Sequence, residues 1–261
     1  MSRAATLTAL RDRIRLLEQP ARHGVLPFGA AAIDAALPGG GLALGALHEI
    51  VDAGGDEEDG ATAAGFAAGI LARLGPVLWC LKRPDLYGPG LAAHGLDPSR
   101  LVLVAARCDE DILWAVEEGL RTGASAGLAA VVGEIGRLPM AAGRRLQLAA
   151  EHSGVTSLLL RRWRNAAEAA AERGRPTAAV TRWRINALAS ADIAGMPGIG
   201  QPRWRVELMR VRGGVPASWE VEVADATGHV RVSAELADRP AAPGTEKPRR
   251  GRAEPLLRRA G

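Results

Sequence analysis

The chain has 261 residues, of which 48% are apolar, and it carries a formal net charge of +4 at pH 7. This length is enough for one well-buried α/β domain with appendages, or for two small domains. No apolar run approaches the ~20 residues that a membrane-spanning helix needs, and the arginine-rich first residues lack the apolar segment of a secretory signal, so we expect a cytoplasmic protein without membrane contact.

The first residues predict an amphipathic helix that ends before Pro20 and Gly24. Its apolar stripe is formed by Leu7, Leu10, Ile14 and Leu17. We therefore treat residues 1–24 as an N-terminal helix. The stripe is narrow enough to pack either on the chain's own core or on a neighbouring copy, so these residues are candidates for self-association.

From residue 42 onward, apolar runs of strand length alternate with alanine-rich helical stretches. Strands are expected at 46–52, 76–81, 100–106, 127–135 and 155–160, and helices at 60–75, 85–95, 109–122 and 139–153. This alternation is typical of an α/β fold with a mainly parallel sheet between helices. Residues 178–188, 203–214 and 218–232 alternate with period two instead, which predicts antiparallel strands or hairpins at the end of the sheet.

The last residues are charged and rich in proline and alanine, which is typical of a disordered tail. Residues 239–261 hold seven basic and two acidic residues, a net charge of +5, which leaves the preceding residues at −1. We divide the chain into the N-terminal helix, a core at 25–237 and this basic tail at 238–261. The tail either aids solubility and contacts nucleic acid non-specifically, or forms a short helix on a partner. Its candidate partner-binding residues are Arg249, Arg250, Arg252, Leu256, Leu257, Arg258 and Arg259.

The stretch "GDEEDGAT" at 55–62 has the glycine spacing of a nucleotide-binding P-loop, G-x-x-x-x-G-K-[ST]. Gly55, Gly60 and Thr62 keep that spacing, but Ala61 stands where the lysine belongs. Four carboxylates fill the positions that would surround phosphate, and each would repel a triphosphate at ~5 Å by about 1 kcal/mol even in bulk water. We therefore expect no bound nucleotide or other cofactor.

A simpler interpretation of the same stretch is an exposed acidic turn whose carboxylates favour the positive end of the following helix. A metal site is disfavoured, because four adjacent acids on one loop cannot all converge on one ion. The five histidines are scattered without ligand spacing, and the cysteines Cys80 and Cys108 are expected to be ordinary core or near-core thiols in a reducing compartment. The sequence thus predicts no metal and no catalytic residue.

The flanking sequence resembles the core of RecA-type recombinases. The most specific part is "LPFGAAAIDAALPGGGLALGALHEI" at 26–50, followed by "GLDPSRLVLVAA" at 95–106 and "WRVELMRVRGGVPASWEVEV" at 204–223. The resemblance covers about residues 25–232. It implies a RecA-like core with a mainly parallel sheet flanked by helices and with antiparallel hairpins at the C-terminal end.

Three positions depart from the active members of that family. Ala61 replaces the P-loop lysine, Gly133 or Glu134 occupies the slot of the magnesium-positioning aspartate, and Lys82 and Arg83 follow the strand that should lead into a water-activating glutamate. Without lysine, ordered metal and base, phosphoryl transfer loses its main electrostatic and positioning contributions. We expect a RecA-like fold that does not hydrolyse ATP.

Among proteins with this combination, the chain resembles the ImuA family of bacterial mutagenesis cassettes. The resembling stretches are "LTALRDRIRLLE" at 7–18, "LHEI" at 47–50, "PVLWCLKRPDLYGPGLAAHGLDPSRLVLV" at 76–104 and "WAVEEGLRTGA" at 114–124. The resemblance implies an accessory protein of SOS-induced translesion DNA synthesis. Its implied partners are ImuB, a Y-family polymerase homologue without catalytic residues, and a DnaE-type error-prone polymerase; RecA, DNA and a second copy of the chain are further candidates.

Arg-Trp-Arg occurs at 162–164, 182–184 and 203–205. On a strand the two arginines share one face and the tryptophan lies on the other, so the tryptophans are expected in the core and the arginines in solvent. The alternative is an arginine surface that contacts DNA phosphates. The candidate DNA-binding residues are Arg161, Arg162, Arg164, Arg182 and Arg184, and the segment 161–184 falls where RecA-type proteins place a DNA-contacting loop.

Two other functions compete with the accessory role. One is an active DNA-dependent ATPase or recombinase that recruits its lysine from elsewhere in the fold, with Lys82 as the nearest candidate. The other is a cell-division inhibitor of the SulA type, which fits the long βα pattern and the basic tail less well.

Overall fold

The computed structural model describes residues 23–52, 56–163, 165–190, 200–223 and 227–236. The predictions for the N-terminal helix, the basic tail, Gly55 and Arg164 lie outside these residues. No helix in the described part of the chain combines the length and the apolar character needed to cross a membrane.

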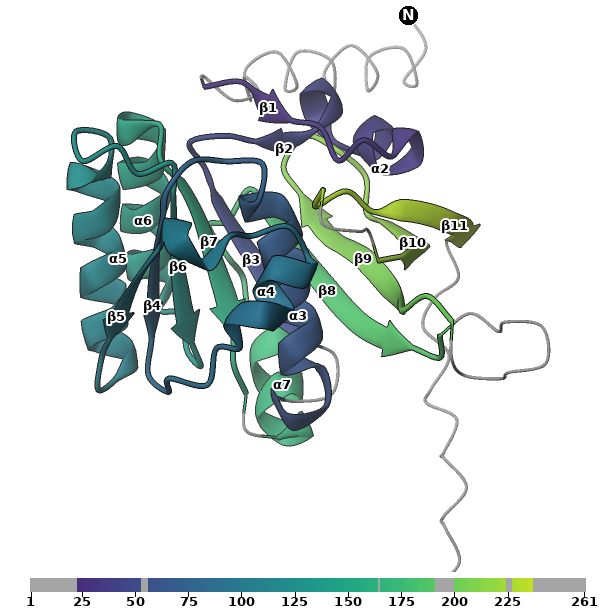
Figure 1. The fold of residues 1–261 in the computed structure, drawn as a ribbon. Helices are drawn as coiled ribbons and strands as arrows, with labels where there is room; N and C mark the ends of the chain where they lie inside the picture. Colours follow the sequence, from purple (N-terminus) through teal and green to yellow (C-terminus); the bar gives the residue numbers. More distant parts are fainter. Residues whose placement is uncertain (1–22, 53–55, 164, 191–199, 224–226, 237–261) are drawn as a thin grey trace, which may run out of the picture.

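A nine-stranded sheet forms the centre of the molecule, in the order β11-β10-β9-β8-β3-β7-β6-β4-β5 (Figure 1). The strands are β3 (Leu47–Asp52), β4 (Val77–Leu81), β5 (Leu101–Ala105), β6 (Ala130–Ile135), β7 (Thr156–Arg161), β8 (Thr181–Leu188), β9 (Arg203–Val211), β10 (Ala217–Glu222) and β11 (Arg231–Leu236). A separate antiparallel pair, β1 (Val25–Leu26) and β2 (Leu42–Ala43), precedes the sheet.

The six strands from β8 to β5 are parallel to one another, and β9, β10 and β11 continue the sheet in antiparallel pairs. The mainly parallel α/β sheet with antiparallel strands at its C-terminal end is therefore confirmed. One strand differs from expectation: β8 was grouped with the antiparallel strands, but it pairs parallel with β3 and antiparallel with β9. The physical reason is a helix after β7 that returns the chain to the start of β8, as a parallel connection requires.

Helices cover both faces of the sheet (Figure 1). They are α2 (Ala31–Ala36), α3 (Asp56–Leu71), α4 (Gly88–Ala93), α5 (Asp109–Gly123), α6 (Met140–Ser153) and α7 (Ala166–Arg173), with short 3₁₀ turns at Pro38–Gly40 and Pro98–Arg100. Ile50 and Trp79 point to the core under α3 and α4, whereas Leu47 and Cys80 on the same strands point to the core under α5 and α6. Burial on both faces explains why the parallel strands appear in the sequence as unbroken apolar runs.

Cys80 is a core residue, as expected, and burial raises the pKa of its thiol to about 12.

His48 is a fully buried polar residue on the central strand β3. Its Nδ1 lies 2.7 Å from Thr181 Oγ1 and its Nε2 lies 2.8 Å from the carbonyl oxygen of Ala43. Burial lowers the pKa of His48 from 6.5 to about 4, against a smaller opposing effect of the Ala43 carbonyl. The imidazole is therefore neutral in the folded protein and joins β3, β8 and β2 through its two ring nitrogens.

The lowered pKa makes stability depend on pH. The unfolded chain binds a proton at His48 below pH 6.5, whereas the folded protein binds it only near pH 4. The contribution of neutral His48 is present above pH 6.5 and is lost as the pH falls from there to about 4, by about 1.4 kcal/mol per pH unit. Urea unfolding at several pH values should show this slope, and His48→Gln should flatten it. An equal slope in the two proteins would contradict the assignment.

Candidate functional site

The carboxyl ends of the parallel strands meet at one edge of the sheet, which is where open α/β sheets bind their ligands. The first turn of α3 follows β3, Glu134 lies at the end of β6, Arg161 ends β7, and Lys82 follows β4. The fold thus brings the degenerate P-loop, the second altered motif and part of the arginine segment to the same edge, which we call the carboxyl edge. Figure 1 shows it at the lower end of β3, β6 and β7.

The degenerate P-loop differs in its backbone from the expected acidic loop. Helix α3 begins at Asp56, four residues earlier than the sequence pattern indicated, so the acids at 56–59 occupy its first turn. Carboxylates are favourable at this position because the N-terminus of a helix carries partial positive charge. Gly60 is buried, Ala61 is exposed and Thr62 is half-buried. A helical turn therefore replaces most of the loop that would wrap around phosphate.

Glu134, the residue in the second altered motif, is bound to other side chains. It is 3% exposed, and its Oε1 accepts a hydrogen bond of 2.8 Å from the indole nitrogen of Trp79. Its Oε2 lies 3.6 Å from Arg162 Nε, and Arg162 also donates to Asp85 at 3.0 Å. The neighbouring Gly133 is packed so closely that an added Cβ would lie 2.8 Å from Val116, which excludes a larger side chain there. The carboxylate of Glu134 thus forms part of a protein-internal ion cluster.

Lys82 donates to Asp109 Oδ1 at 2.6 Å. The other oxygen of Asp109 accepts from the backbone amides of Gly136 and Arg137 at 3.1 and 2.9 Å. Burial alone would raise the pKa of Asp109, but the hydrogen bonds from Lys82 and from these amides lower it below its usual value. Three strand spacings of about 4.8 Å separate β4 from β3, so the root of Lys82 is about 14 Å from the end of β3. Lys82 is therefore poorly placed to replace a P-loop lysine.

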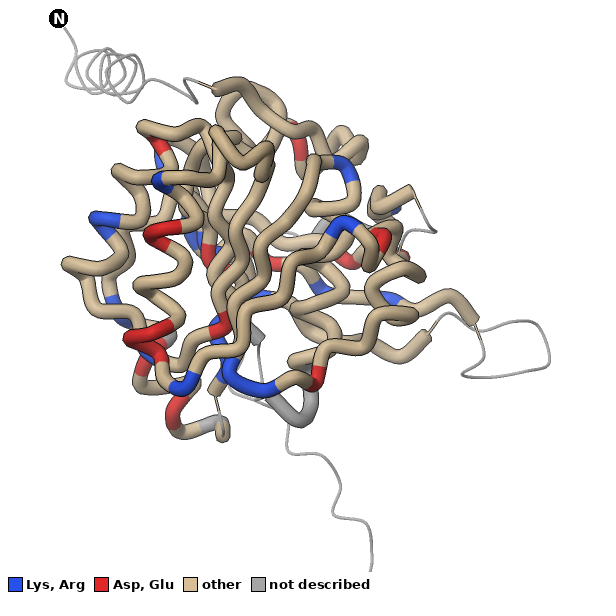
Figure 2. The backbone as a smooth tube through the Cα atoms, turned by 60° about the vertical axis from the view of Figure 1, so that its left-hand side comes forward, with Lys and Arg blue, Asp and Glu red and all other residues tan. Residues whose placement is uncertain are grey.

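The carboxyl edge carries more carboxylates than cations. Its cations are Lys82, Arg83, Arg107, Arg137 and Arg162, and its carboxylates are Asp85, Asp109, Glu110, Asp111 and Glu134, in addition to the acids of the first turn of α3. Figure 2 shows acidic and basic positions close together at the lower end of the molecule. Because DNA binding depends mainly on uncompensated positive charge, this edge has no strong attraction for a phosphate backbone.

A buried ion network lies next to this edge, centred on Glu49 of β3, which is fully buried. Its carboxylate accepts from Arg182 Nε at 2.9 Å, from Arg161 at 3.4 Å and from the hydroxyl of Thr177. Arg161 also donates to Glu172 of α7 at 3.1 Å. Glu49 and Glu172 thus pair with Arg161 and Arg182, and the half-exposed Arg175 also pairs with Glu172 at 3.1 Å. Burial lowers the pKa of Arg161, and the nearby carboxylates of Glu49 and Glu172 oppose this effect.

The network changes the assignment of the arginine segment. Arg161 is 4% exposed and Arg182 is 6% exposed, so neither guanidinium has a free surface for a DNA phosphate. Arg162 is bound to Asp85 and Glu134, and Arg184 is bound to Glu207. The prediction that Arg161 and Arg182 contact DNA is therefore wrong, because both are buried against carboxylates. Their charge is neutralised inside the protein by carboxylates that lie far away in the sequence.

The expected DNA-contacting loop contains a helix instead. Asn165 caps α7, since its side chain accepts from the amide of Glu168 at 3.0 Å. Ala169 packs with Trp163 and Val51, and Glu172 pairs with Arg161, so α7 is fixed to the sheet by apolar and ionic contacts. This helix was not predicted.

The tryptophans of the Arg-Trp-Arg repeats behave as expected. Trp163, Trp183 and Trp204 are 1%, 0% and 6% exposed, which confirms that they pack in the core. The expectation that the neighbouring arginines point into solvent is wrong for Arg162, Arg182 and Arg184, which are bound to carboxylates. The alternation along the strand correctly places the tryptophan and the arginines on opposite faces. The face with the arginines is also covered, because carboxylates of other segments bind them.

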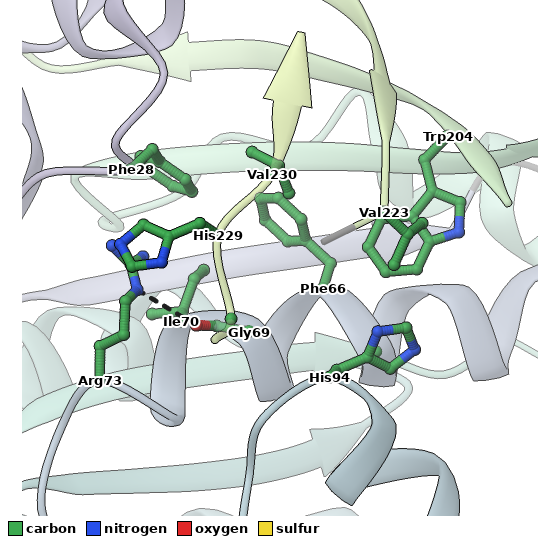
Figure 3. Close-up of a pocket in the computed structure, with 12 residues that line it drawn as sticks. Phe28, Phe66, Gly69, Ile70, Arg73, His94, Trp204, Val223, His229 and Val230 are labelled. Atoms are coloured by element: carbon green, nitrogen blue, oxygen red, sulfur yellow. Dashed lines mark hydrogen bonds between the residues drawn. The ribbon is translucent and has the colours of Figure 1, made fainter. Parts of the chain in front are cut away.

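A small hollow lies away from the carboxyl edge, between α3, α4, β9 and the segment before β11 (Figure 3). Phe28, Phe66, Trp204, His94 and His229 contribute to its walls. Its volume is about 10 Å³, close to the space that one water molecule needs, so it cannot hold a nucleotide.

Two curated relatives match this chain. Both are named Protein ImuA and come from two strains of Caulobacter vibrioides, and each is 39% identical over 225 residues, which covers 82% of this chain and 91% of the relative. The chain belongs to the ImuA family. No protein-family model matches the sequence. The family assignment made from short sequence stretches is thereby confirmed.

Several residues of this ImuA-family site were not singled out from the sequence. Glu49, Glu172 and Thr177 complete the buried network, and Asp85 and Asp109 pair with the basic residues of the carboxyl edge. One signal was available: Glu49 is a charged residue within the apolar run of a central strand, where a carboxylate requires a buried partner.

Removing the central carboxylate should destabilise this ImuA-family protein strongly. In Glu49→Gln, Arg161 and Arg182 would lose the carboxylate that they share, and breaking a buried ion pair costs about 3–5 kcal/mol. Glu220→Gln is the matched control, because Glu220 pairs with the half-exposed Arg205 and such a pair contributes about 1 kcal/mol or less. Urea unfolding measures both; equal losses would refute the central role of Glu49.

Proposed function

We propose that this ImuA-family protein is a non-catalytic accessory protein of damage-induced mutagenesis, which acts by binding other macromolecules in SOS-induced translesion synthesis. Family membership supports a role in damage-induced mutagenesis. The partners in this proposal are an ImuB-type inactive polymerase homologue and a DnaE-type error-prone polymerase. The site of action is the cytoplasm.

One observation carries the non-catalytic part of the proposal. The altered nucleotide-handling positions have other roles in the fold: the acids at 56–59 begin a helix, Glu134 is bound to Trp79 and Arg162, and Lys82 is bound to Asp109. A phosphoryl-transfer site needs a lysine, an ordered magnesium ion and a positioned base. Its side chains must be free to contact the nucleotide and the metal, and not engaged in ion pairs with the rest of the protein. The excess of carboxylates at the carboxyl edge further favours protein partners over DNA there.

Nucleotide binding tests this proposal directly. With the lysine replaced by Ala61 and acids in the first helical turn, we expect a labelled ATP analogue to bind with a Kd weaker than about 1 mM, in the presence or absence of magnesium. Equilibrium binding at micromolar protein concentration measures this. Tight magnesium-dependent binding that is lost in Thr62→Ala would overturn the proposal.

An active ATPase remains the alternative, with Lys82 as the substituted lysine. It requires ATP hydrolysis that single-stranded DNA stimulates and that Lys82→Ala abolishes. We expect no such hydrolysis, because Lys82 follows β4 at a distance from β3 and is paired with Asp109. Asp109→Asn is the matched variant: if the pair is structural, both variants lose stability and neither changes the background hydrolysis rate.

The basic tail gives a further test. Deleting residues 239–261 removes a net charge of +5 together with Leu256 and Leu257. We expect this deletion to weaken a partner complex or salt-dependent DNA binding, without changing the urea unfolding midpoint of the core. An unchanged pull-down and an unchanged DNA affinity would remove the tail from the proposed function.

A further inference from the structure

The outer surface of α5 and α6 combines exposed apolar groups with a hollow. Between the two helices lies a groove of about 550 Å³, lined by Glu117, Arg121, Arg145, Leu148, Ala149, His152 and Ser153. Leu148 of this groove is 64% exposed. Trp114 is 68% exposed and lies on the same stripe of α5, three residues before Glu117 and seven before Arg121. The exposed leucine thus lines the groove, and the exposed tryptophan lies on the same face of α5 as Arg121, two turns before it.

Trp114 is exceptional among the tryptophans of the chain. All six lie in the described residues, and Trp79, Trp163, Trp183, Trp204 and Trp219 are at most 6% exposed. Exposing this indole leaves a large apolar surface in contact with water. Its neighbours at i−4 and i+4 are Glu110 and Glu118, so no apolar side chain one turn away on α5 covers it.

The lining of the groove has two arginines and one carboxylate, whereas the acids Glu110 and Glu118 flank Trp114. Arg121 and Arg145 approach the same carboxylate, Glu117, at 2.9 and 3.0 Å. The two arginine side chains are 60% and 59% exposed, whereas Glu117 is 11% exposed. One carboxylate cannot neutralise two guanidinium groups, so the exposed sides of both arginines remain available for a further anion.

We infer that this groove binds an amphipathic helix of a protein partner, with aliphatic side chains over Trp114 and Leu148 and an Asp or Glu against Arg121 and Arg145. A groove between two helices commonly binds a third, amphipathic helix. The apolar side chains of that helix that enter the groove recur at positions i, i+3 or i+4, and i+7. The carboxylate supplies the missing negative charge. This inference rests on the proposed accessory function and assigns the partner to one surface.

A second copy of the chain fits the groove less well. In a two-fold dimer through this surface, the groove would face itself and bring Arg121 and Arg145 toward the same residues of the other copy. Like charges close together at an interface disfavour such a complex. The groove therefore fits a different protein that carries a helix with leucine-type and acidic side chains.

The exposed indole provides the experiment. Iodide reaches Trp114 and not the buried tryptophans, so iodide quenching of the full-length protein reports on this groove. The probes are tryptophan-free 20-residue peptides that tile the ImuB-type partner. We expect one or more tiles with aliphatic residues at helical spacing and an acidic residue to abolish quenching, and Trp114→Phe to remove the quenchable signal altogether.

Affinity for the intact ImuB-type partner is measured in parallel by calorimetry. Combined Trp114→Ala and Leu148→Ala should weaken binding at least tenfold, and Arg145→Gln should weaken it several-fold, with wild-type urea midpoints. Tyr87→Ala is the matched control, because Tyr87 is 71% exposed at the start of α4 and should leave binding unchanged.

The outcomes separate the two proposals. Unchanged partner affinity in the double variant, or protection of Trp114 by a basic tile only, would overturn the groove assignment and leave the accessory function intact. A double variant that dissociates a dimer of this chain without affecting the partner would assign the groove to self-association and equally overturn the inference. Failure of the wild-type protein to bind the partner would overturn the proposed function itself.

Discussion

The buried carboxylate of Glu49 is the interaction on which the arrangement of this molecule depends most. It lies on the central strand and binds arginines from both neighbouring strands, Arg161 of β7 and Arg182 of β8. Through Arg161 and Glu172 the same network reaches α7. Because charges without partners are costly in a protein interior, all these groups must be placed together when the chain folds. The network therefore couples the order of the strands to the position of the helix that covers them.

This coupling explains how a segment that resembles a DNA-contacting loop becomes part of the core. The arginines of 161–184 are plentiful enough to suggest a phosphate-binding surface, but their partners determine their role. With Glu49, Glu134, Glu207 and Asp85 in reach, the positive charge is used to hold strands and loops together. Exposed positive charge lies elsewhere, for example on Arg121 and Arg145 in the groove between α5 and α6.

Much of the sheet could be predicted from the sequence, because its parallel strands are buried on both faces and appear as apolar runs such as 76–81 and 155–160. The pairing partners of Glu49 could not be predicted, since Arg161 and Arg182 are 112 and 133 residues away and no local pattern relates them. Helix α7 does have a local signal in the sequence, because Asn165 followed by Glu168 in an alanine-rich run is a capping pattern. The exposure of Trp114 also depends on which helices pack beside it, which the sequence does not state.

The early start of α3 has an evolutionary consequence. A change of Ala61 to lysine would restore the P-loop sequence motif. The residues before it would still form the first turn of α3, and the four acids at 56–59 would remain in that turn. Several simultaneous changes, in backbone path and in charge, separate this chain from a working nucleotide site. Under the proposed accessory function, a single substitution would not return such a chain to nucleotide binding, and its surface would be free to specialise for partners.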